Sequence, residues 1–125
     1  MAISEIVGVY DADGGLLGEV AYVWGKVRGT RHCGLCDITH ATVRRKREWD
    51  RMVATLPVPV RMLHLNEVDE AQAAAVAATR APVVLALDGG AWRELVGAQE
   101  LDEMDGSVAA FEAVVRSRLA VRDEA

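Results

Sequence analysis

Three short apolar runs, each bounded by turn residues, constrain the fold of this chain more than any other feature. The first spans residues 3–10, is rich in valine and isoleucine, and stops at the sequence DADGG. The second, 60–65, is predominantly apolar and contains one histidine, and the third, 83–87, follows Pro82. Runs of this length and composition predict β-strands, and a mostly apolar strand is typical of a sheet covered on both faces.

Helical signals separate these runs. Asp69 and Gln72 have the spacing of an N-terminal cap and its reciprocal partner, ahead of the alanine-rich sequence AQAAAVAATR. Ser107 is a favourable cap for a closing helix. The expected apolar face of that closing helix comprises Val108, Phe111, Val115 and Leu119.

Two further segments are predicted to be helical from the period of their apolar residues. From Asp37 to Leu56, apolar residues can share one helical face, and Pro57 ends the segment. The residues of that face are Ile38, Ala41, Trp49, Met52, Val53 and Leu56. Residues 16–27 also have helical spacing. Two glycines weaken that prediction, so a hairpin partner for the first strand is the alternative.

A tight hairpin is expected near the end of the chain, because DGG at 88–90 separates the third apolar run from AWRELV at 91–96. The predicted order is strand, helix, extra helix, strand, helix, strand, strand, helix. Without the extra helix, this order resembles the thioredoxin-like fold. The resemblance implies one α/β domain over 1–125, with a central sheet of about four strands, the last two as a hairpin, flanked by helices.

The resemblance also bears on Pro82. In thioredoxin-like proteins, a proline at the start of this strand is cis and faces the cysteine motif. The alternative is that Pro82 simply opens a strand, a position that proline tolerates. One departure matters more: thioredoxins carry Cys-x-x-Cys directly after the first strand, whereas here a predicted helix separates Tyr10 from Cys33. The thioredoxin active site is therefore not carried over to this chain.

Bulk composition excludes some function classes. At 125 residues and 51% hydrophobic, the chain can bury a core without disulfide bonds. A net charge of −5 argues against broad nucleic-acid binding, which needs a basic surface. The start of the chain lacks the pattern of a signal peptide, and no apolar run is long enough to cross a membrane. We expect a cytoplasmic protein, in which paired cysteines are more often catalytic or metal-binding than structural.

The sequence RHCGLCDITH, residues 31–40, concentrates the chemistry of the chain. Cys33, Cys36 and His40 have the spacing C-x2-C-x3-H, and zinc binds thiolate and imidazole ligands together. The fourth ligand would be Asp37, His32, His64 or water. Copper(I) also favours thiolates, so it remains an alternative ion. The string CGLCDITH is similar to one found in small bacterial proteins without an assigned function.

Thiol–disulfide chemistry is the alternative function for this motif. Cys33 would be the nucleophile and Cys36 the resolving residue, with neighbouring basic residues stabilising the thiolate. His40 or Asp37 would move protons during exchange. The protein partner would then be a thiol or disulfide of another chain.

Two simpler explanations of these residues are also open. Free cysteines often just fill space in a core, and a lone histidine such as His64 in an apolar strand is usually a hydrogen-bonded core residue. The basic sequence VRRKREWDR, 43–51, could make the chain a non-enzymatic interaction module for an acidic protein, with Trp49 turned into the core. No glycine-rich phosphate loop is present, so no nucleotide cofactor is expected.

Overall fold

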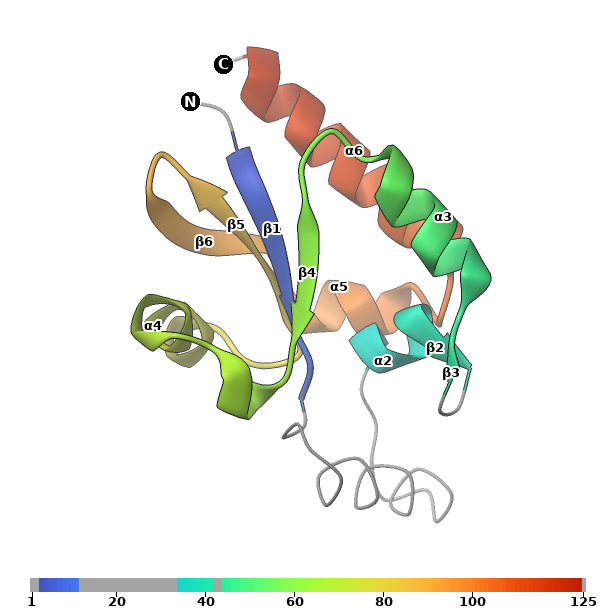
Figure 1. Cartoon of the computed structure of the whole chain (residues 1–125), viewed down its shortest axis with the longest axis horizontal. Coiled ribbons are helices and arrows are strands. Elements are labelled where there is room, and N and C mark those ends of the chain that lie inside the picture. Colours follow the sequence, from blue (N-terminus) through green and yellow to red (C-terminus); the bar gives the residue numbers. More distant parts are fainter. Residues whose placement is uncertain (1–2, 12–33, 42–43, 125) are drawn as a thin grey trace.

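A mixed four-stranded sheet forms the centre of the molecule (Figure 1). The structure is a computed structural model and describes residues 3–11, 34–41 and 44–124. The strands are β1 Ile3–Val9, β4 Val60–Leu63, β5 Val83–Asp88 and β6 Ala91–Val96. They lie in the order β4-β1-β5-β6; β1 is parallel to β4 and antiparallel to β5, and β5 is antiparallel to β6. The predicted α/β fold, with four central strands and a C-terminal hairpin, is confirmed.

Helices cover both faces of this sheet. The other elements are α2 Gly34–Thr39, β2 His40–Ala41, β3 Arg44–Arg45, α3 Arg47–Thr55, η1 Leu65–Glu67, α4 Glu70–Ala78, α5 Ala98–Glu103 and α6 Val108–Glu124. α3 and α6 lie together on one side of the sheet and α4 on the other (Figure 1). α2 packs against α5 near the end of the sheet where β1 finishes.

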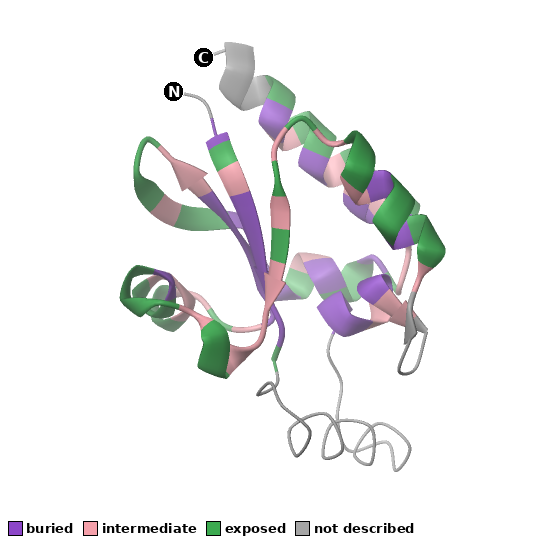
Figure 2. Cartoon of the chain, in the orientation of Figure 1, coloured by how far each residue is buried: buried purple, intermediate pink, exposed green. Residues whose placement is uncertain are grey.

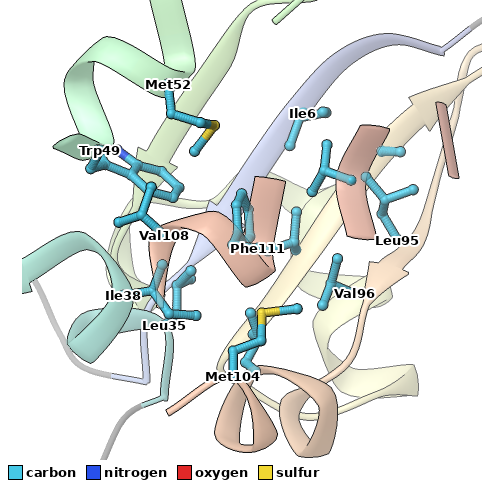
Figure 3. Close-up of a cluster of buried hydrophobic side chains, with 14 of the residues drawn as sticks. Ile6, Leu35, Ile38, Trp49, Met52, Leu95, Val96, Met104, Val108 and Phe111 are labelled. Atoms are coloured by element: carbon cyan, nitrogen blue, oxygen red, sulfur yellow. The ribbon is translucent and has the colours of Figure 1, made fainter. Parts of the chain in front are cut away.

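Two apolar clusters hold these layers together, one on each face of the sheet. The larger joins the sheet to α2, α3, α5 and α6, and Figure 3 shows its side chains converging around Phe111. The Trp49 and Phe111 ring centroids are 5.0 Å apart, and both side chains are buried. The smaller cluster comprises Val7, Val9, Val83 and Leu85, with partly buried residues of α4 packed on it. Figure 2 shows β1 and β5 as mostly buried strands between these layers.

The predicted caps and turns are confirmed. The Asp69 side chain accepts a hydrogen bond from the Gln72 backbone at 2.8 Å, and the Gln72 side chain accepts one from the Asp69 backbone. The Ser107 hydroxyl accepts from the Ala110 N–H at 3.1 Å. Gly89 and Gly90 turn the β5–β6 hairpin with φ angles of 63° and 86°. The predicted inner residues of α6 are buried, namely Val108, Phe111, Val115 and Leu119.

The single helix predicted from Asp37 to Leu56 is wrong. Helix α2 ends at Thr39, β2 and β3 pair as a short hairpin, and α3 begins at Arg47. The Thr39 carbonyl accepts from the Lys46 N–H at 2.8 Å, which closes the hairpin in place of a helical turn. Ile38 and Trp49 are both buried all the same, because the hairpin returns α3 to the same core.

The apolar run at 60–65 forms a strand only to Leu63, and β4 is an edge strand. Val60 and Met62 pack against the larger cluster and Leu63 against the smaller one, while Arg61 is exposed. Helix α5 was not predicted. The Ala81–Pro82 peptide bond is cis, and Pro82 directly precedes β5. The helix or hairpin strand predicted at 16–27 lies outside the described residues.

Candidate functional site

The polar side chains of interest gather at one end of the sheet. Tyr10 directly follows β1, and its N–H donates to the Leu63 carbonyl at 2.9 Å, which places it beside the end of the parallel strand β4. His64 follows β4, and Pro82 precedes β5, whose first residue pairs with Val9. The end of an open sheet beyond its parallel strands is where α/β proteins commonly bind ligands.

Thr39 links Tyr10 to His40. Its hydroxyl oxygen lies 2.9 Å from the Tyr10 hydroxyl oxygen and 2.6 Å from Nδ1 of His40. It also donates to the Cys36 carbonyl over 3.4 Å. Thr39 is fully buried and Tyr10 is 5% exposed, whereas His40 is half-buried. A buried chain of hydrogen bonds therefore runs from the end of β1 to the imidazole of His40.

His64 flanks the same tyrosine. The Tyr10 ring centroid is 5.2 Å from that of His64 and 5.8 Å from that of His40. The backbone N–H and the ring Nδ1 of His64 both bind Oε1 of Glu67, at 2.7 and 2.8 Å. These contacts lower the pKa of the Glu67 carboxyl, first through the backbone N–H and then through the ring. Because an ionised carboxylate only accepts, the proton between Glu67 and His64 lies on Nδ1.

The structure places His64 differently from the expected core histidine. It lies at the strand end, half-buried, and begins the short helix η1. Its ring and backbone bonds to Glu67 at i+3 fix its orientation. The prediction of a hydrogen-bonded histidine is therefore correct in its bonding and wrong in its location within a buried strand.

The structure describes only some of the predicted metal ligands. Cys36 is 7% exposed and belongs to the larger apolar cluster, and Asp37 beside it is half-buried. Cys33 and His32 lie outside the described residues. Within 3–11, 34–41 and 44–124, no three histidine, cysteine or acidic side chains form a group that could hold a metal ion. The predicted set of Cys33, Cys36 and His40 thus remains a prediction.

The helix that carries Cys36 nevertheless lies at the end of the first strand. Tyr10 and Thr39 are 29 positions apart in the sequence, and yet their hydroxyl oxygens lie 2.9 Å apart, with Thr39 in the last turn of α2. The cysteine motif is therefore distant from β1 in the sequence, whereas α2, the helix that carries Cys36, lies beside the end of β1. Sequence reasoning could not find this contact, because a threonine and a tyrosine so far apart carry no shared spacing signal.

Tyr10, Thr39 and Glu67 are the residues that sequence reasoning missed. Glu67 had a usable signal, since a glutamate three residues after His64 has the spacing of a reciprocal cap. Arg47 and Arg51 of the basic segment are exposed on α3, and Trp49 is turned into the core as predicted. Over the described ranges, every helix is too short or too polar to cross a membrane.

Comparison of the chain with models of protein families, with curated proteins and with solved structures finds no match in any of the three. Function is therefore inferred from the geometry of the site.

Proposed function

We propose that this chain binds a thiophilic metal ion, zinc before copper, through Cys33, Cys36 and His40. The observation that supports this proposal best is the 2.6 Å contact between the Thr39 hydroxyl and Nδ1 of His40. A metal-binding histidine is almost always held through its other ring nitrogen by a hydrogen-bond partner. Thr39 supplies such a partner at the end of the helix that carries Cys36.

The chemistry of the donor set favours this ion class. Two thiolates and an imidazole are ligands that zinc accepts together in a tetrahedral arrangement, and copper(I) also takes thiolates. His64, Asp37, His32 or water completes the coordination. A site of this kind needs reduced thiols, which accords with the proposed cytoplasmic location.

Metal analysis of protein purified without chelator tests the proposal. We expect about one zinc ion per chain, because the three ligands form one site. Cobalt(II) in place of zinc should show thiolate-to-metal absorption and the visible bands of tetrahedral coordination. Cys33→Ser, Cys36→Ser and His40→Gln should each reduce or abolish binding. Protein without zinc, and without a thiolate band after cobalt is added, would reject metal binding.

Two paired variants identify the fourth ligand. His64→Gln and Asp37→Asn each remove one candidate while keeping similar side-chain size. Weaker binding in one variant assigns the fourth position to that residue. Unchanged binding in both assigns it to His32 or water, and His32→Gln then separates these two.

A second candidate function is thiol–disulfide exchange. The observation that favours it is the position of α2, whose last residue contacts Tyr10 at the end of β1. In thioredoxin-like proteins, which the order of elements resembles, the helix of the Cys-x-x-Cys motif directly follows the first strand. The Cys33 thiolate would attack a substrate disulfide to form a mixed disulfide, releasing one substrate thiolate. Cys36 would then attack Cys33, so that the substrate is reduced to two thiols and the protein is oxidised.

Alkylation rates and trapping separate this function from metal binding. An exchange enzyme should have a Cys33 thiol whose pKa, read from the pH dependence of alkylation, lies well below about 8.5. The Cys36→Ser variant should accumulate a mixed disulfide with a model disulfide substrate, and Cys33→Ser should not. An ordinary thiol pKa together with no trapped intermediate would reject exchange.

A further inference from the structure

The basic segment, residues 43–51, has a charge opposite to that of the chain as a whole. It holds five of the 14 lysine and arginine residues and only two of the 19 acidic ones, so its net charge is +3 in a chain of −5. In the structure this segment forms β3 and the first half of α3. A cluster of one charge on a protein of the other charge favours encounter with partners of complementary charge.

Two arginines of this segment lie on the outer side of α3. Arg47 and Arg51 are both exposed and, because they are four positions apart, share one face of the helix (Figure 2). Among the residues that the structure describes, neither guanidinium has an ion pair or a hydrogen bond, although Glu48 and Asp50 are close in the sequence. Like charges at this spacing destabilise a helix. The stability of α3 therefore does not explain this pair.

The opposite side of α3 is fixed in the core. Trp49 and Met52 are 2% and 5% exposed, and the Trp49 ring centroid lies 5.0 Å from that of Phe111. At the start of the helix, Nζ of Lys46 donates to the Gly106 carbonyl at 2.8 Å. The backbone that carries the two arginines is thus already ordered, so a partner loses little free energy in ordering it.

The spacing of the two arginines suits carboxylates on an extended chain. A guanidinium binds a carboxylate through two parallel hydrogen bonds. Four residues of a helix advance about 6 Å, and alternate side chains of a β-strand lie on one face about 6.7 Å apart. A segment of the type Glu-x-Glu therefore presents one carboxylate to each arginine.

Nucleic acid suits this surface less well. Binding to a phosphate backbone needs a broad basic surface, and the chain has a net charge of −5. Single-stranded nucleic acids also stack their bases on exposed aromatic rings, whereas Trp49, the aromatic residue of the basic segment, is buried. The observations therefore favour an acidic protein segment as the partner.

We propose that Arg47 and Arg51 form a docking site for an extended, carboxylate-rich segment of another protein. Each guanidinium binds one of two alternate acidic side chains of that segment. The site lies on α3 and uses no residue of the cysteine motif, so it is independent of the metal binding proposed above.

Fluorescence anisotropy with a labelled peptide of alternating glutamate and serine tests this docking site on the full chain at low salt. We expect the peptide to bind, and a matched peptide of alternating glutamine and serine not to bind. Arg47→Gln and Arg51→Gln should each weaken binding about 2- to 5-fold, and the double variant about 10-fold. Added salt should weaken binding to the wild type, because exposed charges are screened.

Arg80→Gln is the matched control variant. Arg80 is exposed after the end of α4 and likewise has no ion pair in the described part of the chain. Its replacement removes the same charge from another surface and should leave peptide affinity unchanged. An equal loss of affinity in Arg80→Gln would show that binding follows net charge alone and would overturn the docking site.

Thermal unfolding separates lost docking from lost structure. Arg51→Gln should unfold at or above the temperature of the wild type, because it removes the repulsion between two like charges. Weak peptide binding only in variants that unfold at a lower temperature would overturn the proposal. The zinc content of Arg47→Gln should equal that of the wild type, so failure of the docking site and failure of metal binding are seen separately.

Three other outcomes would also overturn the proposal. The first is no binding of the glutamate peptide to the wild type. The second is tighter binding of a single-stranded oligonucleotide of equal charge through the same arginines, which would make nucleic acid the partner. The third is a dimer of the protein alone, seen by sedimentation and lost in the double variant, which would make a second copy the partner.

Discussion

At Gly34, α2 packs directly against the backbone of α5. A Cβ atom at this position would lie 2.9 Å from the Asp102 backbone nitrogen and 2.9 Å from the Leu101 carbonyl carbon. Backbone atoms cannot move aside as a side chain can, so the two helices must separate to admit a methyl group. Gly34 directly follows Cys33 in the sequence, and its small size therefore decides how closely the cysteine helix packs.

Gly34→Ala should destabilise the protein by about 1–3 kcal/mol, the usual cost of overpacking, despite the better helix propensity of alanine. Chemical denaturation followed by circular dichroism measures the change. Gly8→Ala is the matched control: its Cβ would meet the flexible end of Met62, with the Met62 Cε at 2.5 Å. A smaller loss is expected there, and an equal or larger loss at Gly8 would contradict this explanation.

Some residues of the candidate site can be recognised in the sequence, and others only in the folded structure. Cys33, Cys36 and His40 are visible in the sequence because their types and spacing are those of a metal or redox motif. Thr39 and Tyr10 are not, since their role depends on hydroxyls that meet only in the folded protein. The spacing of residues along the chain predicts contacts within one helix or strand, but it does not predict contacts between different elements.

At the scale of elements, an ion pair connects α5 to α6. The Arg118 guanidinium donates to both oxygens of Glu100 and to the Leu95 carbonyl at the end of β6. The Arg118 hydrogen bond is the main cause of the lowered pKa of Glu100, and the Gly97 N–H adds to it. The same pair raises the pKa of Arg118. One arginine thus joins α6, α5 and β6.

The stabilisation from this pair should depend on pH. Because the pKa of Glu100 is lowered by folding, its contribution is complete above the usual glutamate value of about 4.3 and is lost as the pH falls through the lowered value. Both side chains are about two-fifths exposed, so we expect a coupling of only about 0.5–1 kcal/mol at neutral pH. A double-mutant cycle with Glu100→Gln and Arg118→Met measures it. A coupling that persists unchanged in acid would contradict the assignment.

Some elements could be predicted from local sequence signals alone, and others could not. The cap of α4 and the glycine turn of the β5–β6 hairpin were predictable, since each depends on residues within a few positions of one another. The break between α2 and α3 was not, because the apolar period continues across it. Helix α5 was also missed: AQELDE has only six residues, too few to display a helical period.

For the molecule as a whole, stability depends mainly on the larger apolar cluster. Phe111 lies at its centre with 1% of its surface exposed and contacts Trp49 of α3 (Figure 3). This contact joins the two helices that cover the same face of the sheet. The cluster also includes Leu35, Cys36 and Ile38 of α2, so loosening the core would reach the candidate site.

Phe111→Ala should reduce the free energy of unfolding by about 3–5 kcal/mol, since a large cavity replaces the ring. Denaturant titration measures the loss, and Phe111→Leu should cost clearly less because more of the volume remains filled. If the alanine variant lost less than about 1 kcal/mol, Phe111 would not be central to the core.

The sequence by itself determined the order of the main strands and helices, the hairpin and the caps, and it predicts the cysteine motif as the candidate site. These features depend on residue type and short-range spacing, which the chain carries whether or not it is folded. The tertiary structure alone decided that 37–56 breaks into two helices, that His64 lies at a strand end, and that Thr39 joins Tyr10 to His40. The physical reason is that packing and buried hydrogen bonds act between elements distant in the sequence, and they override local preference wherever burial requires a partner.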